Sequence, residues 1–168
     1  MSGLDHNSTS TNGDIGGRVS WTSALMALPR EQLVSTVDEI AKEFNVRPIA
    51  LPASGLGMLK LKDSALEQSF FLGEFPLATA SIELTLADGR QIQGAAQILD
   101  DDSSYATSLA IADAVLAHKV SGFESLIELV LLGKKNVLRE QAIRNSMLMR
   151  TKVDFSLLSM ADGDDDEL

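Results

Sequence analysis

Two alternating runs of residues, joined by an Asp-Gly turn, constrain the fold of this chain more than any other feature. Residues 77–86 alternate apolar and polar side chains, which is the pattern of a half-buried strand. Asp88-Gly89 supplies the positive φ angles of a tight hairpin turn, and residues 91–99 alternate again as the return strand. The chain must therefore contain an antiparallel hairpin with one apolar face, and other elements must cover that face.

Helical spacing of apolar residues dominates both sides of this hairpin. The predicted helices are residues 20–28, 29–44, 100–118 and 134–150. Residues 123–132 fit a buried strand as well as a helix. The remaining runs that predict strands are 47–52, 55–62 and 68–73. Helices, then a meandering sheet, then helices predict an α+β fold with an antiparallel sheet of four to five strands.

The composition predicts one domain between two tails. A chain of 168 residues suits a single domain, which we place at residues 18–160. Residues 1–17 carry almost nothing to bury and predict a disordered tail, and residues 161–168 predict an acidic tail. Neither a signal peptide nor an apolar run long enough to span a bilayer is recognisable, so we expect a cytoplasmic protein with no membrane partner.

The chain offers few residues for catalysis. The lack of cysteine excludes thiolate chemistry, cysteine-bound zinc and iron–sulfur clusters. One histidine, His6, lies in the predicted tail, and the other, His118, lies at a predicted helix end, where an imidazole commonly caps carbonyls. Residues 54–57 resemble part of a phosphate-binding loop but lack the rest of the motif. We therefore predict no catalytic, cofactor-binding or metal-binding residue.

Charge is spread unevenly along the chain. The net charge of −10 argues against binding to nucleic acid or to anionic membranes. Residues 134–152, however, carry six cations and one anion, so this stretch is +5 and the rest of the chain is −15. Two interpretations stay open: a solvated helix face, or a docking surface for an acidic partner or a polyphosphate. Arg139 and Arg144 would suit the second, because arginine makes planar bidentate contacts.

Four stretches of the chain carry a resemblance to a known family. They are residues 21–27, residues 55–62, a long run from residue 70 to residue 114, and Thr151-Lys152-Val153-Asp154-Phe155. The long run contains the family-motif residues Gly73, Glu74, Asp88, Gly89, Gly94 and Asp113. Together these pieces resemble, in order and spacing, the PhnG family, the G subunit of the bacterial carbon–phosphorus lyase system that degrades phosphonates.

The resemblance implies an accessory, non-catalytic subunit. In that system a nucleosidase-like subunit, helped by the G, H and L subunits, transfers the ribose triphosphate of ATP to an alkylphosphonate and releases adenine. The expected partners are these subunits, chiefly the nucleosidase-like one. The residues that we expect to contact a partner are Trp21, Arg139, Arg144, Val153, Asp154 and Phe155. The alternatives are a stand-alone nucleotide- or phosphate-binding regulatory protein and an enzyme that uses carboxylates alone.

The chain departs from the family pattern at two places. The family tends to show Gly-Arg-Asp after the return strand, where this chain has Asp100-Asp101-Asp102, so the charge at Asp101 is reversed. If the family's arginine contacts a phosphate or a partner carboxylate, this chain has lost or rewired that contact. The family also tends to carry an aromatic residue where Ser156 stands.

Overall fold

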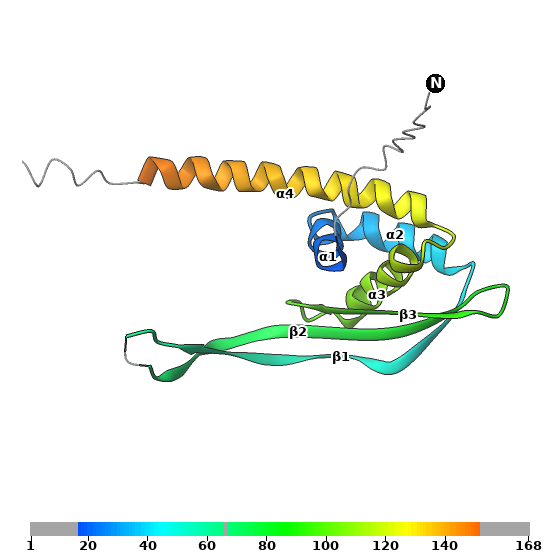
Figure 1. Ribbon diagram of the computed structural model, residues 1–168, viewed down its shortest axis with the longest axis horizontal. Coiled ribbons are helices and arrows are strands. Elements are labelled where there is room, and N and C mark those ends of the chain that lie inside the picture. Colours follow the sequence, from blue (N-terminus) through cyan, green and yellow to red (C-terminus); the bar gives the residue numbers. More distant parts are fainter. Residues whose placement is uncertain (1–16, 66, 152–168) are drawn as a thin grey trace, which may run out of the picture.

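The computed structural model describes residues 17–65 and 67–151. Within them the elements are α1 (Arg18–Met26), α2 (Arg30–Ala41), β1 (Asn45–Lys62), β2 (Ser69–Thr85), β3 (Gln91–Ile98), α3 (Ser103–His118) and α4 (Phe123–Thr151). The strands form one antiparallel sheet in the order β1-β2-β3, and the helices lie on one face of it (Figure 1). The predicted α+β class and the order of helices, sheet and helices are confirmed.

The described part of the sheet has three strands, so the prediction of four to five was wrong. The predicted strands 47–52 and 55–62 are both parts of β1, and the runs at 68–73 and 77–86 are both parts of β2. Prolines and glycines suggested breaks, but β1 accommodates Pro48 and Pro52 through shifts in register. Proline is tolerated there because β1 is an edge strand and pairs with β2 alone.

Residues 123–132, which fit a strand or a helix, are the first turns of α4. This helix continues without interruption through Gly133 to Thr151. Gly133 is not a helix break but a point of close packing, since a Cβ there would overlap the carbonyl oxygen of Ala24 on α1. The two predicted segments are therefore one 29-residue helix.

The core lies between the sheet and the helices, with α3 at its centre. α3 packs on β2 and β3 with one side and meets α1, α2 and α4 with the other. Its buried residues include Ala106, Ala110 and Ala114, whose small side chains let the helix approach the sheet closely. The other elements contribute larger side chains, chiefly Leu25, Leu33, Val37, Ile82, Leu84, Leu126 and Val130.

Asp102 caps the first turn of α3. Its carboxylate accepts hydrogen bonds from the backbone N–H groups of Ser104 at 2.8 Å and Tyr105 at 3.1 Å. Arg30 of α2 pairs with Asp102 at 3.1 Å and with Asp100 at 2.5 Å, and its guanidinium lies 4.4 Å from the centroid of the Tyr105 ring. The predicted helix start at these carboxylates is confirmed, and Arg30 ties it to α2.

Replacement of Asp102 with alanine should lower the free energy of unfolding by about 1–2 kcal/mol, because the variant loses the N-cap hydrogen bonds and the Arg30 contact. Asp101→Ala is the matched control. Asp101 is exposed and makes no hydrogen bond or ion pair within the described residues, so its loss should change stability by about 0.5 kcal/mol or less. Urea unfolding of both variants measures the two changes in the free energy of unfolding. Equal changes would contradict the role of Asp102 as the N-cap of α3.

Candidate partner-binding surface

β1 and β2 extend beyond the end of β3 as a two-stranded arm, which we define as residues 55–65 and 67–77. β3 pairs with β2 only over residues 78–85, whereas β1 and β2 stay paired as far as Lys62 and Ser69. The arm and the C-terminal half of α4 project from the same side of the body (Figure 1). An isolated two-stranded hairpin is marginally stable in water, so an arm of this kind needs packing on at least one face.

Both faces of the arm expose apolar side chains. Directly paired residues share a face of an antiparallel ladder, so Leu56 and Met58 continue the face on which Ala78 is buried, while Leu59 lies on the opposite face. Leu56 is 70% exposed and Met58 is 61% exposed. The other exposed large apolar residues of the arm are Leu61, Phe70, Phe71 and Leu72. Monomeric proteins rarely expose contiguous apolar surface of this extent.

The C-terminal half of α4 leaves the body in the same way. Every side chain described from residue 138 to residue 149 is exposed, and the large apolar ones are Leu138, Ile143, Met147, Leu148 and Met149. Arg139 and Arg144 make no ion pair within the part of the chain that the structure describes. They lie five residues apart, about 140° around the helix, so they face different surroundings.

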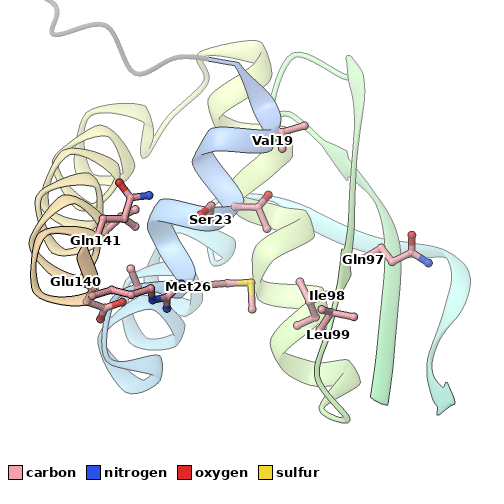
Figure 2. A pocket seen from close by; sticks show the side chains of 12 residues that line it. Val19, Ser23, Met26, Gln97, Ile98, Leu99, Glu140 and Gln141 are labelled. Carbon is pink, nitrogen blue, oxygen red and sulfur yellow. The ribbon is translucent and has the colours of Figure 1, made fainter. Parts of the chain in front are cut away.

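A pocket of about 670 Å³ lies between α1, the end of β3 and α4. In Figure 2, Met26 of α1 extends across it toward Ile98 and Leu99, and Glu140 and Gln141 of α4 stand on the other side. Arg144 also lines this pocket, whereas Arg139 does not. The pocket offers apolar walls, hydroxyls, amides, one arginine and the carboxylate of Glu140, so a partner side chain that enters it can be apolar and can meet one cation at Arg144.

The structure separates the residues that we expected to contact a partner. Arg139 and Arg144 both lie on the projecting half of α4, and Arg144 reaches the pocket. Trp21 is half-buried on α1 and packs against the core, so it supports the body rather than either projection. Val153-Asp154-Phe155 lies outside the described residues.

The hairpin turn and the contact between α3 and β3 account for three of the family-motif residues. Gly89 adopts a φ of 83° at the β2–β3 turn, in the region that favours glycine. Asp88 accepts hydrogen bonds from the backbone N–H of Arg90 at 3.0 Å and from its side chain at 2.6 Å, and these bonds lower the pKa of Asp88. Gly94 lies against α3, where a Cβ would overlap the carbonyl oxygen of Ala110.

Asp113 joins three elements. Arg18 of α1 forms a bidentate ion pair with its carboxylate, in which the Nε–Oδ1 distance is 2.8 Å. The same carboxylate accepts a hydrogen bond from the backbone N–H of Ala95 on β3 at 3.2 Å. The hydrogen bond to Asp113 raises the pKa of Arg18. Asp113 of α3 therefore holds α1 and β3 together at this point of the body.

Gly73 and Glu74, the remaining family-motif residues, lie on the arm and are exposed. We did not predict that the apolar residues around them lie on the surface, although their pattern in the sequence is unusual. Leu56, Met58, Leu59 and Leu61, and then Phe70-Phe71-Leu72, put apolar side chains at both odd and even positions. Apolar side chains at both sets of positions fit a strand covered on both faces, and this part of the sheet has neither face covered by a described element.

These features define an α+β domain in which helices cover one face of a small antiparallel sheet while two elements project uncovered. The sequence model of the family described as phosphonate metabolism protein PhnG matches residues 17–160. The chain belongs to this family, and its role lies in phosphonate metabolism. No significant match was found among curated proteins. Within residues 17–65 and 67–151, no helix combines the length and apolarity needed to cross a membrane.

Proposed function

We propose that this chain is an accessory, non-catalytic subunit of the cytoplasmic carbon–phosphorus lyase core complex. There it supports transfer of the ribose triphosphate of ATP to an alkylphosphonate with release of adenine. The pair of uncovered projections carries this proposal, because each exposes apolar surface that a subunit interface would bury. Membership of the PhnG family supports the same role.

Seven large apolar side chains of the arm, from Leu56 to Leu72 and including Phe70 and Phe71, stand at least 38% exposed. Burial of an apolar side chain of this size against a partner contributes about 1.5–3 kcal/mol. Even after the cost of association, a surface of this kind favours a stable complex over a free subunit.

The pocket favours a partner contact over a free nucleotide. Arg144 is the single cation that lines it, and the carboxylate of Glu140 stands one turn away on the same helix. A triphosphate would bring several negative charges beside that carboxylate and find one counter-charge, whereas a single partner carboxylate needs only the one that Arg144 supplies. A nucleotide-binding regulator remains the second candidate because Arg144 and the pocket are present.

Co-expression of this chain, carrying a tag, with the nucleosidase-like subunit should yield a stable hetero-complex whose mass gives its stoichiometry. The reason is that the arm and α4 then bury the apolar surface that they expose in the free chain. Native mass spectrometry of the eluted species is the measurement. A lone, folded monomer that binds ATP in a titration would overturn the subunit role and favour the regulator.

A further inference from the structure

Helices α3 and α1 lie between the first half of α4 and the sheet within the body. α3 packs on the sheet, and α1 contacts both α3 and α4. β3 ends at Ile98 and α3 begins at Ser103. The C-terminal end of the third strand and the N-terminal end of the helix that packs on it therefore lie at the same end of the body. The pocket marks that place, since α1, the end of β3 and α4 line it. Beyond it, the arm and α4 continue without any described element between them (Figure 1).

The inner side of α4 keeps the same orientation along the projection. Val130 is fully buried and Val137 lines the pocket. Arg144 follows Val137 by seven residues, as Val137 follows Val130, so all three lie on one side of the helix within about 40°. Leu148 lies seven residues after Gln141, which also lines the pocket, and about five full turns after Val130. The side of α4 that covers α1 therefore continues outward as Arg144 and Leu148.

The arm likewise continues the face of the sheet that α3 covers. Ala78 is fully buried beneath the helices. Leu56, paired with Pro76, and Met58, paired with Glu74, lie on that same face but stand 70% and 61% exposed. Both surfaces that enclose the helical layer in the body thus extend past its end, and nothing in residues 17–65 or 67–151 fills the space between them.

We infer that one α-helix of a partner subunit fills this position, packed between Leu56 and Met58 of the arm and Leu148 of α4, and that it carries a carboxylate that pairs with Arg144. This inference rests on the proposed function. A helix suits this position because helices, α1 and α3, separate the same two surfaces within the body. The acidic character follows from charge: Arg144 has no ion-pair partner among the described residues, and its segment, 134–152, is +5.

Four single variants of the full chain test the inference by their affinity for the nucleosidase-like subunit. Met58→Asp and Arg144→Glu should each weaken binding at least tenfold, because one places a charge against the helix and the other opposes its carboxylate. Lys42→Glu is the matched charge-reversal control, since Lys42 is exposed at the C-terminal end of α2 and lies outside both projections, and it should bind within about threefold of the wild type. Arg144→Lys should recover part of the affinity lost by Arg144→Glu.

Amide hydrogen exchange distinguishes a helix held by both projections from other occupants. Adding the nucleosidase-like subunit should slow exchange in residues 55–62 and in residues 140–149 together, and should protect one helical segment of that subunit. A complex in which only one projection is protected, or neither, would overturn the inference and leave the proposed function standing. Protection of both through self-association of this chain alone would also overturn it. Absence of any complex would remove the proposed function and the inference with it.

Discussion

Deleting the arm should leave a folded domain that no longer enters the complex. Ser54 and Ala78 are directly opposite each other in the ladder, so an Asn-Gly pair can join them as a two-residue hairpin turn. None of the buried core residues lies between them, and we therefore expect the melting temperature to change by about 5 °C or less. Affinity for the nucleosidase-like subunit should fall by about a hundredfold or more, since the large apolar contacts are gone.

Circular dichroism and thermal unfolding of the purified variant establish that the domain is intact, and co-purification reports assembly. Leu51→Asp serves as the control. Leu51 is 86% exposed on β1 but lies outside the arm, so a charge there should leave assembly intact. If the shortened chain assembled as well as the wild type, the arm would not be the interface, and α4 alone would have to hold the partner.

Replacing Gly94 with valine should destabilise the whole domain by about 3 kcal/mol or more, at the upper end of the cost of overpacking a core. A Cβ at Gly94 would overlap the carbonyl oxygen of Ala110 and lie 2.7 Å from the amide nitrogen of Ala114. Both neighbours are main-chain atoms of α3, which cannot turn aside as a side chain could. The helix would have to move off the sheet, and the core between them would open.

Gly73→Val provides the comparison, because Gly73 is also a family-motif glycine in a strand. No atom lies within 4 Å of a Cβ at Gly73, and valine suits an extended strand, so the free energy of unfolding should change by about 0.5 kcal/mol or less. Chemical denaturation of both variants gives the two values. Similar values would show that α3 does not depend on Gly94 for its position.

Local sequence patterns correctly predicted the helices and strands that pack against the chain's own core. The turn at Asp88-Gly89 depends on the φ angles of its own residues, and the start of α3 depends on a carboxylate close in sequence to the N–H groups that it caps. The half of β2 that also pairs with β3, from Ala78 onward, alternates apolar and polar side chains, because one face meets α3 and the other is polar. Features of this kind depend on a few neighbouring residues, so they can be predicted from the sequence without knowledge of the fold.

The predicted number of strands was wrong because the continuity of β1 and β2 depends on contacts between segments that are distant in sequence. Pro48, Pro52 and Gly55 are ordinary breaks in a central strand, but β1 is at the edge of the sheet and accommodates them. Pro76 is tolerated in β2 for a similar reason, since β3 has already ended there. Whether a strand lies at an edge depends on which strands pair with it, and distant segments decide that.

The sequence by itself determined the α+β class, the hairpin turn, the helix start at Asp102 and the uneven charge, because propensity, capping and periodicity act over short range. Only the tertiary structure decided which apolar residues belong to the core and which to a surface. Leu84 is fully buried on the face of the sheet that α3 covers, and Leu56 is exposed on the arm, although both are leucines in strands of the same sheet. The difference is that α3, which begins at Ser103 beside the end of β3, does not extend over the arm, and burial depends on what covers a residue as well as on what the residue is.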